Sequence, residues 1–487
     1  MKKQGVNPIL PIDEYIADGE PHIYDGRVYL FGSHDQENGE TFCMNDYVFY
    51  SAPVEDLSDW SNKGISYRAV QDPLYNETTR YMYAPDVVKG NDGKYYLYYC
   101  MSGYKGRGGY SNPISVAVAD KPDGPFEFLG FVKDRNGKPY TKHLCFDPAL
   151  INDDGIIRLY YGTDYPQYKD VTPESEKRRI ISDIACVDEK DIEDVDNYMG
   201  AYMVELEDDM LTIRSEATRI DDKISGKGYD KHMFFEGSSI RKIKDKYYFI
   251  YSSTANHELC YAISDRPDRD FIFKGVIISN GDIGIKGRKI EDSLNTTGTN
   301  HGSIEYINGQ WYVFYHRLTH NCDYSRQACS EKIEIKEDGT IAQVEVTSCG
   351  LNDGPLKAEG RYPAVICCNL TNGKMPHISN QRTYTHIPYI SSGNNERFIA
   401  QIIDDTLIAY KYFEFDGKTK LIFNCRKGKG TFEVSIDNEK SIAMIDIEES
   451  EDWKEFSTTL DLKGTYPLYV RYKGTDAELL DIGFEKD

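Results

Sequence analysis

The chain has 487 residues, of which 40% are hydrophobic and 13% aromatic, with 39 tyrosines against three tryptophans. It is longer than a single hydrophobic core usually grows, so two domains are expected, and its many tyrosines and phenylalanines favour strands over helices. The formal net charge of −23 predicts repulsion from nucleic acid and from anionic membrane surfaces, whereas a neutral substrate remains compatible with it.

The N-terminal residues and the cysteines indicate the compartment. No apolar stretch of the kind that begins an export signal follows Met1, and no later run approaches the length of a membrane span. The 11 cysteines are an odd number, and many lie inside apolar segments, which is typical of reduced, buried thiols. The sequence therefore predicts a cytoplasmic protein with no nucleic-acid or membrane partner. It leaves the oligomeric state open.

One pattern occurs five times along the chain. Each copy has a polar residue at the head of a short apolar strand, a turn rich in Gly, Asp and Asn, and a second strand rich in tyrosine. The distance from the polar head to the matching tyrosine varies only from 10 residues (Asp86 to Tyr96) to 13 residues (Asp147 to Tyr160). The copies span residues 18–33, 84–99, 146–162, 235–253 and 300–315.

Such radial repetition predicts an all-β fold whose N-terminal part is a five-bladed β-propeller. If the first strand of each hairpin lies innermost, all five polar heads face one central channel. These heads are Asp18, Asp86, Asp147, Glu236 and His301. The alternative is a β-sandwich in which the aspartates are turn residues, but the constant phase of the polar residue argues against it.

Several carboxylates that share a channel cannot all ionise freely, so their pKa values must spread apart. Glu236 follows Phe234 and Phe235 and has the most apolar neighbours, which suits a protonated general acid. Asp18 has more polar neighbours, which suits an ionised general base. An acid that faces a base across a pocket with room for a water molecule is the arrangement for glycoside hydrolysis with inversion.

Three motifs carry a family resemblance, namely residues 17–22, 146–150 and 235–238. They resemble glycoside hydrolase family 43, whose members are five-bladed propeller enzymes that include β-xylosidases, α-L-arabinofuranosidases and arabinanases. The likeness covers about residues 7–350. It implies that Asp18 is the general base, that Glu236 is the general acid, and that Asp147 tunes and orients the acid.

The resemblance leaves a second base open and adds substrate-binding candidates. Gly19 follows Asp18 where many members have proline, so Glu20 on the same strand face is an alternative base. Other motifs resemble places where the family contacts substrate or holds a water or calcium ion on the axis. They imply that Asp86, His301 and Arg326 bind substrate. They leave open whether His301 also holds a calcium ion, and they imply that no cofactor is required. Further candidates to line the sugar subsite are His22, Phe31, His34 with Asp35, Tyr83 and Tyr104. For half of these residues, a place in the core is the alternative.

The five-fold pattern stops near residue 350, so the expected domains are residues 1–350 and 351–487. Residues 164–230 form a polar insert that is expected to rim the pocket, and no chemistry is assigned to it. The C-terminal residues alternate apolar and polar side chains, which predicts a jelly-roll-like β-sandwich. Its part after Tyr410 resembles a family 6 carbohydrate-binding module. Residues 474–484 lack the asparagine and aromatic residues of that module's ligand cleft, so packing against the propeller is an equal expectation, and Trp453 is expected in the core.

The sequence thus predicts an inverting, exo-acting glycosidase. Its expected substrates are pentose-containing oligosaccharides derived from arabinoxylan or xylan, from which it would release α-L-arabinofuranosyl or β-D-xylosyl units. Two alternatives stay open, a propeller that binds sugar without hydrolysing it and an endo-acting arabinanase or xylanase of the same family. The complete set of three carboxylates favours an enzyme over a binding protein.

Overall fold

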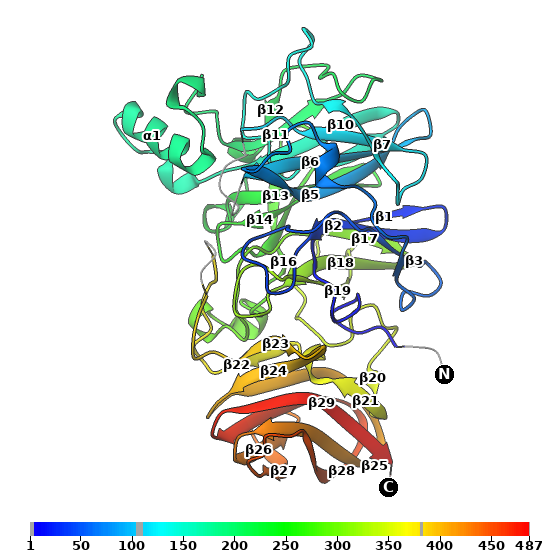
Figure 1. Cartoon of the computed structure of the whole chain (residues 1–487). Coiled ribbons are helices and arrows are strands. Elements are labelled where there is room, and N and C mark those ends of the chain that lie inside the picture. The colour runs from blue at the N-terminus through cyan, green and yellow to red at the C-terminus, as the bar shows by residue number, and fades with distance from the viewer. Residues whose placement is uncertain (1–3, 104–110, 380–382, 487) are drawn as a thin grey trace.

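The computed structural model describes residues 4–103, 111–379 and 383–486. Its strands form five small antiparallel sheets, followed in the chain by one large sheet. Figure 1 shows the small sheets in the upper part of the molecule and the large C-terminal sheet below them. The all-β prediction is therefore confirmed.

The five small sheets are the blades of a propeller. Four blades have four strands and the last has three, and in each blade the strands follow chain order or its reverse across the sheet. The blade strands are β1 (Ile16–Tyr24), β2 (Arg27–His34), β3 (Tyr50–Pro53), β4 (Ser61–Asn62), β5 (Thr79–Lys89), β6 (Tyr95–Gly103), β7 (Ser115–Ala119), β8 (Glu127–Phe131), β9 (Ala149–Asp153), β10 (Ile156–Thr163), β11 (Gly200–Glu205), β12 (Thr218–Arg219), β13 (Phe234–Ile243), β14 (Lys246–Ser253), β15 (Leu259–Ser264), β16 (Ile272–Ile278), β17 (Ser303–Ile307), β18 (Gln310–Arg317) and β19 (Gln327–Ile333).

The first strand of each blade lies at the axis. β1 contacts β5, β5 contacts β9, β9 contacts β13, β13 contacts β17, and β17 contacts β1, which closes a ring of five. The backbone N–H of Ile9 donates to the carbonyl of Ala328 on β19 at 3.0 Å, so the N-terminal segment joins the last blade. This closed ring excludes the alternative that the five hairpins belong to a sandwich.

Tyrosines fill the spaces between adjacent blades. Five hydrophobic clusters each combine side chains from two neighbouring blades. Tyr160 and Tyr161 on β10 show how the pattern arises, because successive side chains on a strand point to opposite faces. Tyr160 therefore packs between the third and fourth blades and Tyr161 between the second and third. The tyrosine-rich second strands of the repeats thus supply both faces of each blade.

The C-terminal sheet folds into layers around one hydrophobic core. Two long strands of 21 residues each, β25 and β28, pair along most of their length and run through the layers. Its strands are β20 (Leu356–Lys357), β21 (Gly360–Pro363), β22 (Asn369–Thr371), β23 (Tyr389–Gly393), β24 (Glu396–Ile402), β25 (Leu407–Lys427), β26 (Gly430–Ser435), β27 (Ser441–Ile447), β28 (Lys454–Gly474) and β29 (Ala477–Lys486).

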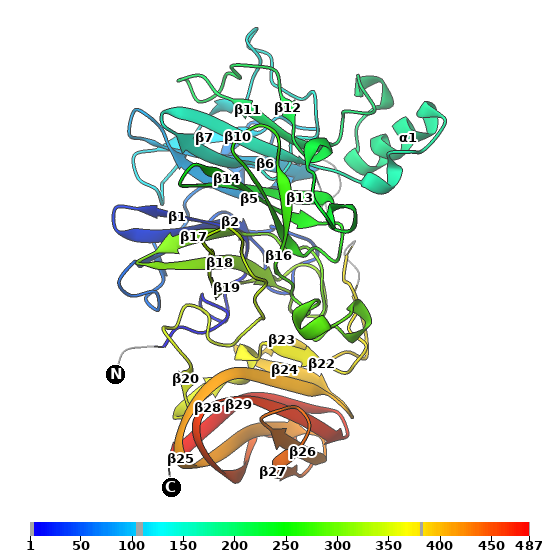
Figure 2. The same ribbon diagram turned by 180° about the vertical axis from the view of Figure 1, so that it is seen from behind.

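Helices are few among the described residues. The α-helix α1 (Glu174–Ala185) projects from the propeller, away from the C-terminal sheet, in both views of the ribbon (Figures 1 and 2). The short 3-10 helices are η1 (Ala69–Gln71), η3 (Pro166–Tyr168), η4 (Glu189–Asp191), η5 (Asp221–Lys223), η6 (Tyr229–Lys231), η7 (Ile285–Gly287), η8 (Ile290–Asp292) and η9 (Ala364–Ile366). None of these described helices has the length and apolar character needed to cross a membrane.

A buried ion pair joins the C-terminal sheet to the propeller. Lys411 on β25 is 2% exposed, and its Nζ lies 3.1 Å from Oδ2 of Asp282 and 2.9 Å from Oε2 of Glu345. Asn369 donates a further hydrogen bond to Asp282 at 3.0 Å. Buried charges need such partners, because an unpaired ion is costly to desolvate. The C-terminal sheet is therefore attached by specific polar contacts as well as by apolar packing.

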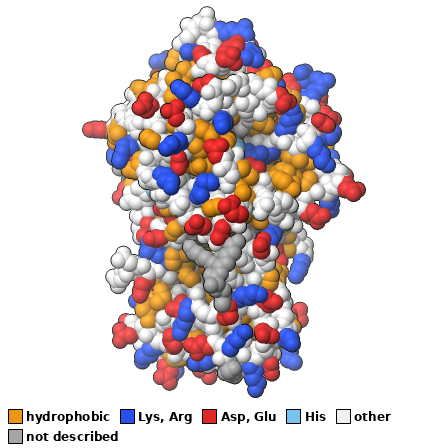
Figure 3. Space-filling model, turned by 90° about the vertical axis from the view of Figure 1, so that its right-hand side faces the viewer, with side chains coloured by type: hydrophobic (Ala, Val, Ile, Leu, Met, Phe, Trp, Pro, Cys, Tyr) orange, Lys and Arg blue, Asp and Glu red, His pale blue; other side chains and the backbone are white. Residues whose placement is uncertain are grey.

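Two surface features bear on the ligand and on the C-terminal sheet. Acidic and basic side chains are interspersed over the face in Figure 3, so the net negative charge is not gathered into one patch there. Trp453 is half-buried, with the guanidinium of Arg426 at 4.2 Å from its ring centroid. The prediction that Trp453 lies in the core is wrong, because the residue stays partly exposed just before β28, where Arg426 lies over its ring.

Candidate active site

Three innermost strands bring their carboxylates to the axis. Asp18 lies on β1, Asp147 lies two residues before β9, and Glu236 lies on β13. The backbone is irregular at each place. Asp18 and Asp147 have left-handed φ angles of 54° and 46°, and the pairing of β13 with β14 shifts on both sides of Glu236. Because bulges and left-handed residues re-aim side chains, these carboxylates depart from the alternation of a regular strand.

Asp18 is paired with a buried arginine. Nη1 of Arg326 lies 2.8 Å from Oδ1 of Asp18, while Nε and Nη2 of the same guanidinium bind the two oxygens of Asp35 at 2.9 and 3.1 Å. Arg326 is 4% exposed, so both contacts lie in a water-poor environment. The backbone N–H of Asp18 donates to Nδ1 of His316 at 3.1 Å. The carboxyl group of Asp18 therefore accepts a charge-assisted hydrogen bond from Arg326, which Asp35 holds in place.

The environment of Glu236 favours the protonated carboxylic acid. Burial, together with the negative charge of Asp18, raises the pKa of Glu236 to about 8, and the positive charge of Arg326 opposes this only in part. The residue keeps some accessible surface, as a proton donor to a ligand requires. Glu236 is therefore protonated at neutral pH. The site thus holds a protonated carboxylic acid and, near it, a carboxyl group bound by an arginine, and acid/base catalysis uses such a difference in environment.

Asp147 supports the backbone next to the acid. Its Oδ2 accepts a hydrogen bond from the N–H of Gly237 at 3.0 Å. Burial, followed by the charges of Glu236 and Asp18, raises the pKa of Asp147 well above its ordinary range. Gly237 has a φ of 69°, and a Cβ there would lie 3.0 Å from the imidazole of His301. Glycine is thus required here, and Asp147 fixes the turn that carries Glu236.

His301 lies between two of the carboxylates. Its Nδ1 is 3.7 Å from Oδ1 of Asp18 and 3.8 Å from Oδ2 of Asp147. Burial lowers the pKa of His301 although the charge of Asp18 opposes it, so the imidazole is neutral at neutral pH. Its Nε2 is buried and has no hydrogen-bond partner among the described residues. The structure therefore brings His301, Arg326 and the three predicted catalytic residues together.

The orphaned Nε2 of His301 bears on the calcium prediction. Groups of three or more possible metal ligands occur elsewhere in the described chain and do not include His301. Calcium takes six to eight oxygen ligands, so an ion at this place would be held by one protein nitrogen and otherwise by water. The residues present fit a hydrated ion and do not form a protein cage.

A second polar layer occupies the axis next to the site. Oε2 of Glu20 pairs with Nη2 of Arg241 at 3.0 Å, and Nε2 of His22 lies 2.7 Å from Oδ1 of Asp86. The pairing of β1 with β2 shifts between Ala17 and Glu20, so Glu20 does not share the direction of Asp18. Glu20 is therefore engaged by Arg241, and not by the Arg326 that binds Asp18. The alternative that Glu20 is the base is therefore disfavoured by its geometry.

Asp86 belongs to the same layer and not to the pocket. It is fully buried, its Oδ1 accepts from His22 and from the N–H of Val87, and its Oδ2 accepts from the N–H of Leu150 at 2.7 Å. Burial opposes ionisation, but His22 and the other donors outweigh it and lower the pKa of Asp86. The prediction that Asp86 contacts substrate is corrected here, because its carboxylate joins the first three blades.

Two other predicted sugar contacts are also corrected. Phe31 has no exposed surface, because it packs in the cluster between the first and second blades, 4.9 Å from the ring of Phe49. The ring nitrogens of His34 face the carbonyl of Asp46 at 2.7 Å and the carboxylate of Glu14 at 3.3 Å. Both residues therefore stabilise the first blade. Tyr104, another predicted subsite residue, lies outside the described residues.

Sequence reasoning did not assign Asp35 and His316 to the machinery around Asp18. Asp35 entered only as the neighbour of His34, yet its two oxygens bind the guanidinium of Arg326. His316 lies on β18 and is fully buried against the backbone of Asp18. A histidine among the apolar residues of a central strand was the available signal for His316. Asp35 offered none, because its partner is 291 residues away.

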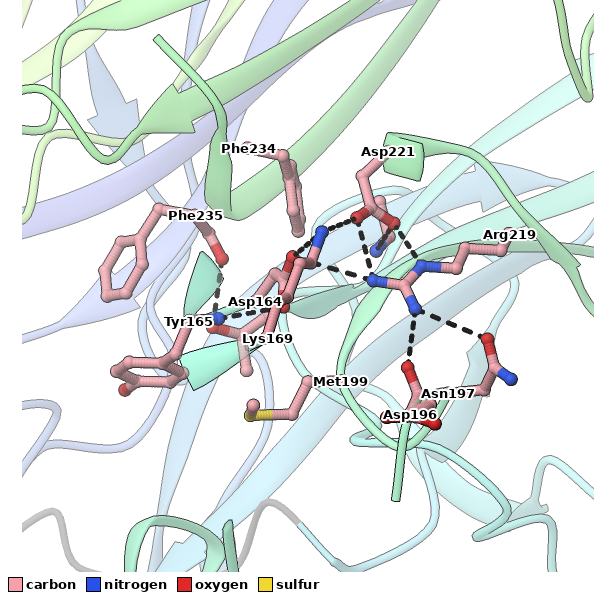
Figure 4. Close-up of polar contacts among 12 residues, drawn as sticks. Asp164, Tyr165, Lys169, Asp196, Asn197, Met199, Arg219, Asp221, Phe234 and Phe235 are labelled. Carbon is pink, nitrogen blue, oxygen red and sulfur yellow. Dashed lines mark hydrogen bonds and ion pairs between the residues drawn. The ribbon is translucent and has the colours of Figure 1, made fainter. Parts of the chain in front are cut away.

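The insert between the third and fourth blades is anchored to the acid-bearing strand by a polar network (Figure 4). The N–H of Asp164 donates to the carbonyl of Phe235 at 2.8 Å, and Nζ of Lys169 lies 2.9 Å from Oδ2 of Asp164. The guanidinium of Arg219 binds both oxygens of Asp221 at 3.0 Å. Asp164 and Asp221 are each 2% exposed. The insert thus contributes buried ion pairs next to β13, whereas the sequence predicted only a solvated rim of the pocket.

The fold and the site define a class of protein. A propeller that holds a protonated glutamate, an arginine-paired aspartate and a third carboxylate at one end of its axis has the parts of a glycoside hydrolase. The family model for glycosyl hydrolases family 43 matches residues 7–182 and 185–341. The chain therefore belongs to glycosyl hydrolase family 43, and it is a glycoside hydrolase.

Similar proteins agree with this assignment. The chain is 41% identical over 502 residues to a xylosidase/arabinosidase of Thermoclostridium stercorarium, which covers 99% of this chain and 98% of that protein. It is 30% identical over 353 residues to a xylosidase/arabinosidase of Bacteroides ovatus, covering 68% of this chain and 95% of that protein. A solved family 43 β-xylosidase/α-arabinofuranosidase from a compost metagenome is 25% identical with a TM-score of 0.52, covering 71% of this chain and 98% of that one.

Proposed function

We propose that the protein is an exo-acting, inverting glycosidase that releases α-L-arabinofuranosyl or β-D-xylosyl units from oligosaccharides derived from arabinoxylan or xylan. The observation that carries this proposal is the different environment of two carboxyl groups that meet at the propeller axis. Glu236 is a protonated acid with a pKa of about 8, and Asp18 is a carboxylate held by Arg326. Relatives named xylosidase/arabinosidase support the choice of pentosyl substrates.

The proposed reaction is a single displacement. Glu236 donates its proton to the glycosidic oxygen as the bond to the leaving sugar breaks, while Asp18 takes a proton from the water that attacks the anomeric carbon from the opposite face. The water's hydroxyl ends on the released sugar. Glu236 then stands ionised and Asp18 protonated, and exchange with solvent restores both. Asp147 holds the N–H of Gly237 and so keeps Glu236 aimed at the leaving oxygen.

The test is hydrolysis of nitrophenyl α-L-arabinofuranoside and nitrophenyl β-D-xyloside by the full chain. We expect release from at least one of them, with inverted product configuration observed by NMR at early times. Xylo- and arabino-oligosaccharides should lose one terminal residue at a time. Binding of these sugars without hydrolysis would support the alternative of a sugar-binding propeller, and internal cleavage of the oligosaccharides would support an endo-acting enzyme.

Three finer parts of the proposal need their own experiments. The orphaned Nε2 of His301 supports a hydrated calcium ion on the axis, which calcium titration of the chelator-treated protein tests. The scattered cysteines support a cytoplasmic location, which cell fractionation tests. Sugar binding by residues 351–487 also stays a prediction, and affinity gels that contain xylan would measure it in the full chain carrying Glu236→Gln.

A further inference from the structure

Three possible metal ligands converge in the fourth blade, at a place that the proposed chemistry does not use. His232 lies two residues before β13, Glu258 lies directly before β15, and Cys260 is the second residue of β15. Each residue offers one ligand atom, and the three atoms lie within 4.8 Å of one another. They are an imidazole nitrogen, a carboxylate oxygen and the thiol sulfur. Two segments that are 26 residues apart in sequence, at residues 232 and 258, thus present donors to one point.

Two of these donor atoms have no other use in the fold. Nδ1 of His232 lies 2.9 Å from Oε2 of Glu258, but their geometry makes no hydrogen bond. Both atoms are buried, and neither has a hydrogen-bond partner in the described part of the chain. Glu258 as a whole is 3% exposed. A buried polar atom left unsatisfied costs about 1–3 kcal/mol, so two that face each other and a thiol call for a ligand.

We propose that His232, Glu258 and Cys260 bind a zinc-type divalent transition metal. The donor set of imidazole, carboxylate and thiolate suits Zn²⁺ or Co²⁺, whereas Ca²⁺ and Mg²⁺ take most of their ligands from oxygen and do not favour a thiolate. For metal–ligand bonds of about 2.0–2.3 Å, tetrahedral ligands lie roughly 3.3–3.8 Å apart, which is within the spread of these atoms. Three protein ligands leave a fourth position for water.

The surroundings of the site suit a metal that enters from solvent. The side chain of His232 is 25% exposed, which provides the path, whereas Cys260 is fully buried in the cluster between the third and fourth blades. The ring of His232 stacks on Phe273 at 5.6 Å, so the imidazole is already held in position. Binding would displace the thiol proton of Cys260 and would therefore strengthen as pH rises.

The other group of possible ligands in the described chain, Glu20, His22 and Asp86, differs in one respect. The guanidinium of Arg241 lies 3.0 Å from Glu20 and already supplies a positive charge to that group. Among the described residues, no arginine or lysine forms an ion pair with Glu258, and His232 is its partner. The fourth-blade site is therefore the better place for an added cation.

The metal would act as a clamp near the general acid without touching the substrate. His257, which precedes Glu258, stacks on Phe235 with ring centroids 4.9 Å apart, and Phe235 precedes Glu236. An ion held by His232 and Glu258 would tie together the two segments that flank this stack. We therefore expect it to raise thermal stability, and this expectation holds whether or not the proposed substrate is correct.

The test uses Co²⁺ as a spectroscopic probe and Zn²⁺ for stoichiometry. All proteins carry Cys186→Ser, because Cys186 is the exposed cysteine of the described chain and would bind metal at the surface. The full-length protein is treated with a chelator and titrated with Co²⁺. We expect one ion per chain, visible bands of a four-coordinate site, and a near-ultraviolet band from thiolate-to-cobalt charge transfer. Elemental analysis should find one Zn²⁺ per chain after dialysis.

Two variants and one control decide the assignment. Cys260→Ser should abolish the charge-transfer band, and Glu258→Gln should weaken Co²⁺ binding by more than about 100-fold, beyond the loss expected for an outer-shell partner. Cys425→Ser removes a buried thiol in the C-terminal sheet and should leave both readouts unchanged. Zn²⁺ should raise the unfolding temperature of the parent and of this control but not of the two site variants.

The parent protein alone can overturn the proposal. If it binds no Co²⁺ stoichiometrically, or binds it without a thiolate band, then His232 and Glu258 form an ion pair and nothing more. A band that survives Cys260→Ser, or equal affinity in Glu258→Gln, would assign the metal to other residues. Because glutamine matches glutamate in shape, a folded Glu258→Gln protein is expected, and its circular dichroism spectrum verifies this.

Discussion

Replacing the proposed general acid by its amide, Glu236→Gln, should slow each substrate in proportion to how strongly its leaving group depends on protonation. The pKa of Glu236 is raised from an ordinary 4.5 to about 8, which opposes ionisation by about 5 kcal/mol. At pH 7 Glu236 is therefore protonated in about nine-tenths of the molecules, whereas a glutamate of ordinary pKa would be protonated in roughly three in a thousand. The protonated fraction of Glu236 at pH 7 is thus about 300 times that of an ordinary glutamate.

Glutamine keeps the shape of Glu236 but has no proton to give. For an oligosaccharide, whose leaving oxygen must be protonated, we expect kcat to fall by about 10²–10⁴-fold, the usual contribution of general acid catalysis. For a dinitrophenyl glycoside, whose leaving group departs as a stable anion, we expect a loss of less than about tenfold. The ratio of the two losses measures the acid role separately from binding or folding.

The pH dependence provides the second half of this test. A raised pKa keeps the proton on Glu236 below about pH 8 and loses it above that value, so wild-type kcat/KM on an oligosaccharide should fall as pH rises through about 8. This alkaline limb should be absent for Glu236→Gln on the dinitrophenyl substrate. Equal losses on both substrates, or an unchanged alkaline limb in the variant, would refute the assignment of Glu236 as the acid.

Three further predictions concern the base, its arginine and the domain contact. Asp18→Asn should lower kcat at least about 100-fold at unchanged unfolding temperature, whereas Glu20→Gln should keep most activity; equal losses would contradict the choice of base. Arg326→Lys should lower kcat at least about tenfold, because one ammonium cannot replace the fork between two carboxylates; an unchanged kcat would show that the pairing is dispensable. Lys411→Met leaves Asp282 without its buried cation and should destabilise the protein by about 3–5 kcal/mol in urea unfolding; a loss under about 1 kcal/mol would contradict this.

The repeat was readable from the sequence because its cause is local. Each hairpin needs a turn residue that accepts a positive φ and strands that alternate between two buried faces, and both leave a mark within about 20 residues of chain. Asp18, Asp147 and Glu236 share one phase in that repeat, so their convergence on the axis followed from it. His301 was placed in the same way, and it lies between Asp18 and Asp147 as a result.

The errors have a common origin in side-chain direction and distant partners. Phe31 and His34 stand on the same blade as Asp18 and were expected beside it, but strand pleating turns Phe31 between two blades. Asp86 occupies a head position like the proposed catalytic residues, yet its carboxylate contacts His22 and the backbone of the third blade. A sequence pattern gives the strand and the phase, while these contacts depend on how neighbouring blades are rotated against each other.

The opposed roles of Glu236 and Asp18 show where each kind of information ends. The sequence by itself determined an all-β chain, a five-fold repeat and a set of polar heads on one axis, because hairpins and strand alternation are written in neighbouring residues. Only the tertiary structure decided which head binds an arginine and which is kept protonated by burial. That choice rests on Arg326, which lies 308 residues from Asp18 and is brought to it by closure of the ring. Burial beside this pair is what raises the pKa of Glu236, and burial is a property of the folded chain.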